Sequence, residues 1–184
     1  LPGSRPIEFE PELGEDFGQL REWPRENVVK LLVFCHPDDD VDTKKTQEER
    51  VKRLFTAARR NDLEFLLEVI PSKVGPVDDM TTPKLIQQFY DVGVYPDWWK
   101  LEPFKTDAAW SNAVEAIERN DSRTRGIVVL GLDAPQSELA ASFALAARQP
   151  LVKGFAVGRT IFGDAARAWM QNEMADADAV DHMA

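Results

Sequence analysis

The sequence has 184 residues, of which 32 are acidic and 22 are basic, so its formal net charge is −10. Charges of both signs are interspersed, without the basic stripe that binding to nucleic acid or to an anionic membrane requires. The single cysteine excludes an internal disulfide framework, and no apolar run approaches the roughly 20 residues that cross a bilayer. We therefore expect one cytoplasmic domain over residues 1–184, with no nucleic-acid partner and no membrane partner. Its oligomeric state is left open, a homo-oligomer included.

The predicted elements alternate between strand and helix along most of the chain. Residues 1–19 are acidic and rich in Pro and Gly, and only Ile7–Glu10 alternate as the end of a strand does. Apolar segments predict strands at residues 28–35, 63–70, 96–103, 125–133 and 152–159. Helical patterns follow at residues 43–60, 83–93, 107–120, 135–148 and 163–169, and another begins near Asp176.

This alternation predicts right-handed βαβ units and a parallel α/β sheet. A doubly wound sheet is one architecture, but no G-x-G-x-x-G or P-loop sequence follows any of the predicted strands. A (β/α)8 barrel of the TIM type is the other, with functional residues at the carboxyl ends of its strands. If the last two strands are seven and eight, the Ile7 segment ends strand three. We therefore expect the carboxyl-terminal three-quarters of a barrel, lacking the first two strands in this chain.

One lysine, Lys100, lies in a short strand of bulky side chains that is bounded by two prolines. Side chains alternate between the faces of a strand, so Trp98, Lys100 and Glu102 are expected on the same face. A lysine is rarely buried without either a carboxylate partner or a chemical role. The strand therefore leaves two interpretations open, a structural pair with Glu102 and a reactive amine.

Charged residues interrupt or end four of the apolar strands. They are Lys30, Glu68, Lys100 and Arg159. A closed barrel could direct all four side chains to the same end of the barrel. A Schiff base forms when an unprotonated amine attacks a carbonyl, and desolvation beside a second cation favours the neutral amine. A nearby carboxylate opposes that effect but can shuttle protons during dehydration. The alternative is an ion-pair network that fills the barrel and has no catalytic role.

Glycines near the end of the chain indicate a phosphate site. Gly131, Gly154 and Gly158, with Arg159 beside the last, combine accessible backbone N–H groups with a fork of side-chain donors. The helix expected to begin near Asp164 adds a partial positive charge. Tight packing between strand and loop is the other explanation for these glycines.

A histidine and three aspartates close the strand of Lys30. His36 and His182 are the only histidines, so a three-histidine zinc site is impossible, whereas a Mg²⁺ site on Asp38, Asp39 and Asp40, serving a metal-dependent lyase, stays open. The simpler interpretation is a solvated loop that caps the following helix, with no chemical role for His36. Cys35 is flanked by apolar strand and needs only a packing role.

Several motifs resemble those of class I tagatose-bisphosphate-type aldolases and, more closely, of the aldolase-like domain fused behind bacterial 5-dehydro-2-deoxygluconokinase of inositol catabolism. They are Val28-Val29-Lys30-Leu31-Leu32, His36-Pro37-Asp38-Asp39, Leu66-Leu67-Glu68-Val69-Ile70, Pro96-Asp97-Trp98-Trp99-Lys100-Leu101-Glu102-Pro103, Gly131-Leu132-Asp133-Ala134-Pro135 and the run from Gly154 to Asp164. The resemblance covers almost the whole chain from about Pro6.

This resemblance implies an aldehyde-lyase that cleaves 2-deoxy-5-keto-gluconate 6-phosphate to dihydroxyacetone phosphate and malonate semialdehyde. Lys100 would form the Schiff base, Glu68 would transfer protons, and Lys30 would be a cation near the substrate. Arg159 with Gly131 and Gly158 would bind the phosphate. Asp133 and His36 complete the expected substrate-binding residues, and the mechanism needs no metal and no cofactor.

The main alternative is a non-catalytic domain that binds a sugar phosphate and regulates an attached sugar kinase. It keeps the same barrel and the same phosphorylated keto-sugar ligand, and a fused or associated kinase domain is the expected partner in both cases. Covalent trapping of a substrate on Lys100 distinguishes the enzyme from the regulatory domain.

Overall fold

The computed structural model describes residues 3–131 and 136–183, and for residues 136–138 and 159–160 it describes the backbone alone. Its strands form one sheet in the order β1-β2-β3-β4-β5, and every neighbouring pair is parallel. The strands are β1 (Val28–Val33), β2 (Glu64–Val69), β3 (Trp98–Leu101), β4 (Gly126–Leu130) and β5 (Val152–Ala156). The predicted parallel α/β fold is confirmed, and each strand lies inside its predicted segment.

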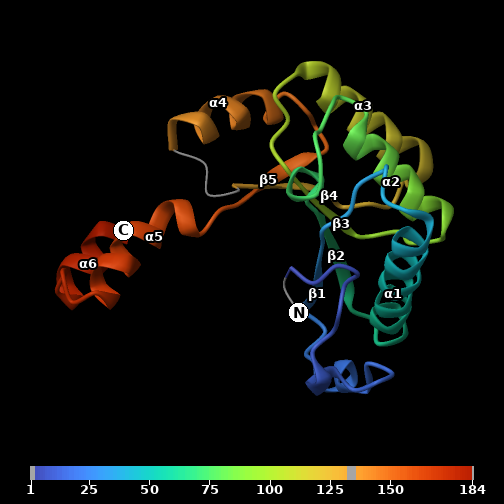
Figure 1. Ribbon diagram of the computed structural model, residues 1–184, viewed down its shortest axis with the longest axis horizontal. Helices are drawn as coiled ribbons and strands as arrows, with labels where there is room; N and C mark the ends of the chain where they lie inside the picture. The colour runs from blue at the N-terminus through green and yellow to red at the C-terminus, as the bar shows by residue number, and fades with distance from the viewer. Residues whose placement is uncertain (1–2, 132–135, 184) are drawn as a thin grey trace.

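Helices follow the strands in turn. They are α1 (Val41–Arg60), α2 (Thr81–Asp91), α3 (Asp107–Asn120), α4 (Gln136–Ala146), α5 (Arg159–Met170) and α6 (Asp176–Met183), with short 3-10 turns η1 (Pro11–Leu13), η2 (Gly18–Glu22) and η3 (Pro71–Lys73). In Figure 1, α1, α2 and α3 lie together on one side of the sheet. The strand order nowhere reverses, whereas doubly wound nucleotide-binding sheets reverse at their ligand crevice. None of the helices described is long and apolar enough to cross a bilayer.

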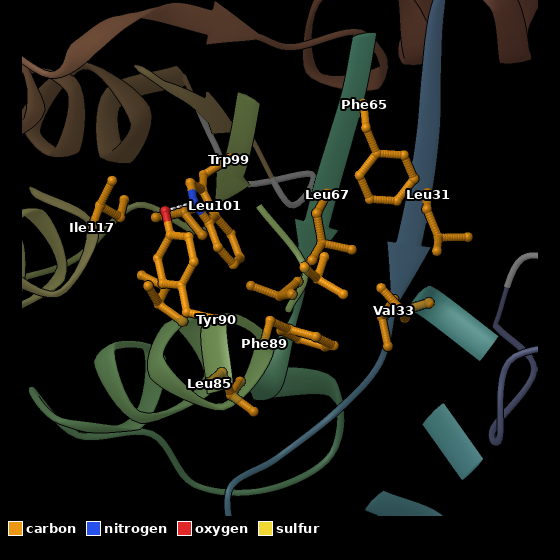
Figure 2. Close-up of a cluster of buried hydrophobic side chains, with 14 of the residues drawn as sticks. Leu31, Val33, Phe65, Leu67, Leu85, Phe89, Tyr90, Trp99, Leu101 and Ile117 are labelled. Carbon is orange, nitrogen blue, oxygen red and sulfur yellow. Dashed lines mark hydrogen bonds between the residues drawn. The ribbon is translucent and has the colours of Figure 1, made fainter. Parts of the chain in front are cut away.

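The core lies between the helices and one face of the sheet. Alternate strand residues such as Phe65, Leu67 and Trp99 are fully buried on this face (Figure 2). Phe65 packs against Phe55 of α1, and Trp99 packs against Phe89 and Tyr90 of α2. The indole N–H of Trp99 donates to the hydroxyl of Tyr90 at 3.0 Å, so this indole buries no unpaired polar atom. Burying one such side chain contributes about 1.5–3 kcal/mol, which makes this face the main source of stability.

The opposite face of the sheet is only partly covered, and we call it the open face. Its residues alternate with those of the core: Val28, Lys30, Leu32, Glu64, Leu66, Glu68, Trp98, Lys100 and Val128. All of them except Glu68 are half-buried or exposed. The open face therefore combines apolar side chains with the charged residues that interrupt the strands.

The amino-terminal segment corrects one prediction. Ile7–Glu10 do not form the end of a strand, although Ile7 is buried. The backbone N–H of Ile7 donates to the side-chain oxygen of Gln47 at 3.1 Å, and its carbonyl accepts from Arg50. Both partners belong to α1, so side chains of a helix take the hydrogen bonds that a neighbouring strand would have taken.

The junction of β5 and α5 corrects a second prediction. Arg159 was expected at the end of a strand, yet β5 ends at Ala156 and α5 begins at Arg159, ahead of the expected start near Asp164. The carbonyl of Gly158 accepts from the backbone N–H of Ile161 at 2.8 Å, which closes the first turn of the helix. Gly163, at the predicted start of the helix, is thus inside it.

Candidate active site

Two lysines meet one carboxylate on the open face. The ammonium nitrogen of Lys30 lies 2.5 Å from Oε2 of Glu68, and that of Lys100 lies 3.2 Å from Oε1. The structure therefore brings together three of the four charged residues that the sequence singled out. We call this group the lysine–glutamate cluster.

Strand register produces this geometry. Glu68 pairs with Lys100 across the β2–β3 ladder, so their side chains leave the sheet side by side. On the other side Glu68 pairs with Leu32, and Lys30 reaches it diagonally from two residues earlier in β1. A shift of one residue in either ladder would turn a lysine to the core face, so the register specifies the cluster.

The three side chains differ in their contact with solvent. The side chain of Glu68 is 7% exposed, that of Lys100 18% and that of Lys30 45%. A buried carboxylate is costly unless paired, and each of its oxygens here has its own ammonium partner. Of the two amines, Lys100 is the more shielded from water, whereas Lys30 borders the solvent.

Glu102 does not pair with Lys100, contrary to the structural interpretation of the Lys100 strand. Its carboxylate accepts hydrogen bonds from the backbone N–H of Ser72 at 3.3 Å and from the hydroxyl of Ser72. Burial raises the pKa of Glu102, and the hydrogen bonds from Ser72 and the charge of Lys73 only partly offset that effect. Sequence reasoning missed Ser72, because nothing in its neighbourhood indicates where the loop after β2 runs.

His36 is buried at the carboxyl end of β1, and both ring nitrogens have partners. Nε2 lies 2.9 Å from the carbonyl oxygen of Pro76, and Nδ1 accepts from the backbone N–H of Asp38 at 3.2 Å. A neutral ring with its proton on Nε2 satisfies both contacts. This arrangement favours a structural role for His36, because neither nitrogen is left for a substrate.

The three aspartates after His36 have separate surroundings. Asp40 accepts from the backbone N–H of Thr43 at 2.8 Å and caps α1, which confirms the predicted helix cap. Asp39 pairs with Arg5 and accepts from the backbone N–H of His36 at 3.0 Å, and Asp38 is exposed. Across the described residues, His, Cys, Asp and Glu side chains form no group of three that could hold a metal ion. Burial raises the pKa of the Cys35 thiol, in keeping with a packing role.

The predicted phosphate residues are partly described. Gly131 and Gly158 follow the adjacent strands β4 and β5, and a Cβ atom there would meet Val157 at 3.0 Å and Phe162 at 2.9 Å respectively. Packing alone therefore accounts for glycine at both positions. Gly154 lies within β5, with open space around it. Asp133 lies outside the described residues, and for Arg159 only the backbone, at the first position of α5, is described.

Five parallel strands in sequential order, with a carboxylate held between two lysines on the open face, define an α/β protein with a candidate lysine-based site. The chain belongs to the family described as "Uncharacterized protein conserved in bacteria (DUF2090)", whose model matches residues 1–184. A search of curated proteins gives no match.

Among solved structures, the chain is similar to the crystal structure of Cgl0159 from Corynebacterium glutamicum. The TM-score is 0.53 at 20% sequence identity, and the match covers 85% of this chain and 50% of that one. At this identity the likeness shows a shared fold. The chain spans half the length of that protein.

Proposed function

We propose that this protein is a class I aldolase that forms a Schiff base through Lys100 and needs no metal. The observation that carries the proposal is the lysine–glutamate cluster, in which one buried carboxylate contacts two lysines. A carboxylate and an amine in direct contact can exchange the proton that imine formation requires. The resemblance to tagatose-bisphosphate-type aldolases supports the same assignment of residues.

The two lysines take different roles in this proposal. Lys100 is the nucleophile, because its side chain is more shielded and water there competes less for the amine. Lys30 holds the other oxygen of Glu68 and remains the more solvated cation. Its charge then attracts an anionic substrate.

Glu68 transfers the protons of imine formation. It takes a proton from Lys100, and the free amine adds to the substrate ketone to give a carbinolamine. Protonated Glu68 then donates to the carbinolamine hydroxyl, which leaves as water and produces the iminium ion. The contact of 3.2 Å between the amine of Lys100 and Oε1 is within reach of such a transfer.

Carbon–carbon cleavage uses the same groups. The regenerated carboxylate of Glu68 accepts the proton of the hydroxyl β to the iminium carbon, and an aldehyde leaves as the bonding electron pair moves into an enamine. Protonation of the enamine carbon and hydrolysis of the imine release the second product and free Lys100. For 2-deoxy-5-keto-gluconate 6-phosphate these products are malonate semialdehyde and dihydroxyacetone phosphate.

The phosphate end of the substrate is assigned to the ends of β4 and β5. Gly131 and Gly158 follow adjacent strands, and α5 begins at Arg159, so its first backbone N–H groups lie next to Gly158. In a TIM barrel the phosphate lies after strands seven and eight, beside the start of a helix. We propose that the sheet is five consecutive strands of such a barrel, which the sequential strand order supports.

Reductive trapping tests the proposal. The full chain is incubated with dihydroxyacetone phosphate and sodium borohydride, and the modified peptide is identified by mass spectrometry. We expect an adduct on Lys100, none in Lys100→Met, and a retained adduct in Lys30→Met at a lower rate. An adduct that maps to Lys30 would reverse the two roles.

Two further outcomes would contradict the proposal. Specific phosphate binding without an adduct would favour the regulatory domain of a sugar kinase. Loss of turnover after treatment with EDTA would favour a metal-dependent lyase that uses Asp38 to Asp40.

A further inference from the structure

The segment that follows the Glu68 strand is attached to the strands on both sides of it. Residues 71–77 lead from β2 toward α2 and include η3. The carbonyl of Pro76 contacts the ring of His36, which follows β1, and Ser72 donates twice to Glu102, which follows β3. Both His36 and Glu102 are 7% exposed, so each contact has one buried partner.

The contact with Glu102 lies where the strand ladder stops. Pairing between β2 and β3 ends at Glu68 and Lys100, the two residues whose side chains meet in the cluster. Terminal ladder pairs fray unless contacts beyond them hold the chains together. The next link described between these two segments is the one from Ser72 to Glu102. The link from Ser72 to Glu102 therefore holds the ends of β2 and β3 together immediately beyond the site.

The link on the other side works in the same way. Pairing between β1 and β2 ends at Val33 and Val69, and the backbone N–H of Ile70 donates to the carbonyl of Val33 at 3.1 Å. The ring of His36 then holds Pro76 at 2.9 Å. Glu68 thus belongs to a strand whose continuation is fixed to both of its neighbours.

We propose that Glu102 and His36 are positioning residues, which hold residues 71–77 against both neighbouring strand ends and so keep Glu68 between Lys30 and Lys100. The catalytic consequence rests on the function proposed above. Within the part of the chain that the structure describes, the hydrogen bonds of the buried Glu102 carboxylate come from one serine. This is an expensive way to stabilise a loop, because an apolar side chain of similar size does the same at lower cost. A requirement for fixed geometry explains its use, since small displacements of reacting groups cost large factors in rate.

The experiment compares Glu102→Ala with Glu102→Gln in the full chain. The glutamine amide accepts from the backbone of Ser72 and donates to its hydroxyl, so it keeps the link without the charge. Ser72→Ala provides a milder break, because Ser72 is exposed and the variant keeps its backbone N–H. A parallel pair, His36→Ala and His36→Gln, tests the other side.

Two measurements do not depend on catalysis. Hydrogen exchange reports the protection of residues 66–77, and the rate at which trinitrobenzenesulfonate modifies Lys100 relative to Lys30 reports the cluster. We expect Glu102→Ala to speed both exchange and Lys100 labelling by several-fold, Ser72→Ala to do so to a lesser degree, and Glu102→Gln to match the wild type. Trapping by dihydroxyacetone phosphate should fall about tenfold or more in Glu102→Ala, with rescue by glutamine.

Two results would overturn the inference. The first is unchanged Lys100 labelling in a folded Glu102→Ala or Ser72→Ala variant. The second is a Glu102→Gln variant as impaired as the alanine variant, which would show that the charge matters and the link does not. If the wild type forms no adduct at all, the proposed function fails, while exchange and labelling still decide whether Glu102 positions the cluster.

Discussion

Two glutamates on the same face of the same strand differ in what their partners can do. Glu64 and Glu68 both project from the open face of β2, four residues or roughly 13 Å apart at about 3.3 Å per residue. Oε1 of Glu64 lies 2.6 Å from a guanidinium nitrogen of Arg125, and Oε2 accepts from the indole N–H of Trp98 at 2.8 Å. Glu68 instead has two lysines as its partners.

The difference lies in proton chemistry more than in charge. Arginine keeps its proton under all conditions in which proteins fold, and an indole N–H does not titrate, so neither of these two partners can exchange a proton with Glu64. A lysine can lose its proton and become a nucleophile. Glu64 is also 30% exposed in its side chain, against 7% for Glu68. Of the two carboxylates, only Glu68 therefore combines shielding with partners that can react.

Other contacts near Glu64, at the amino-terminal end of the sheet, also use donors that do not exchange protons. Asp97, just before β3, accepts from the backbone N–H of Phe65 at 2.7 Å and pairs with Arg59 at 2.9 Å. These contacts tie α1, β2 and the start of β3 together. One end of the open face thus serves stability, and the lysine–glutamate cluster lies toward the other end.

The largest expected effect compares glutamine at the two positions. Glu68→Gln removes the group that moves protons, so we expect adduct formation and turnover to fall by about 10²–10⁴-fold, the usual contribution of a general acid–base. Glu64→Gln keeps an acceptor for Arg125 and Trp98, and the rates should stay within about threefold of wild type by the same reasoning. Rates of borohydride trapping and of aldol cleavage measure both variants.

Equal losses in the two variants would erase the distinction between the glutamates. A loss confined to Glu64→Gln would reverse it. Circular dichroism of both variants is the control for folding.

The next effect concerns stability. Lys100→Met leaves the buried Glu68 with Lys30 as its remaining partner, so we expect the free energy of unfolding to fall by about 1–3 kcal/mol. Arg125→Met removes a partner whose side chain is 57% exposed, and its cost should stay below about 1 kcal/mol. Urea denaturation of both variants at neutral pH measures the difference. A larger loss in Arg125→Met would show that the pair of Glu64 with Arg125 contributes more to stability than the pair of Glu68 with Lys100.

Much of the cluster could be predicted from the sequence. Charged residues inside apolar strands are rare enough to single out Lys30, Glu68 and Lys100, and parallel strands of similar length bring such residues to neighbouring positions. The five strands follow from the same apolar runs. The order of strands in space then follows from short right-handed connections.

Contacts made through loops could not be predicted in the same way. The sequence offered Lys100 as the partner of Glu102, because the two share a strand face, but the loop after β2 brings Ser72 to it instead. His36 contacts a backbone carbonyl, and no residue type indicates which carbonyl that is. The predicted start of α5 was wrong for a related reason, since β5 ends at Ala156, Gly158 directly precedes the helix and Gly163 lies inside it.

The smallest expected effect adds a third carboxylate to the comparison. Burial raises the pKa of Glu102, so the folded protein binds this proton more tightly than the unfolded chain does. The stability contributed by that proton is fully present below the usual pKa of 4.5 and is lost as the pH rises through the raised value. Glutamine does not titrate and keeps the link to Ser72. The stability of Glu102→Gln relative to wild type should therefore increase from pH 4 to pH 8.

Urea denaturation at several pH values measures this difference, and Glu64→Gln provides the control. A Glu102→Gln variant that loses stability relative to wild type as the pH rises would show that the folded protein prefers an ionised Glu102. In that case Glu102 would resemble Glu68, whose charge is balanced by cations on the open face. A relative gain in stability would separate the two carboxylates, one used for its charge and the other for the hydrogen bonds that hold the strand ends together.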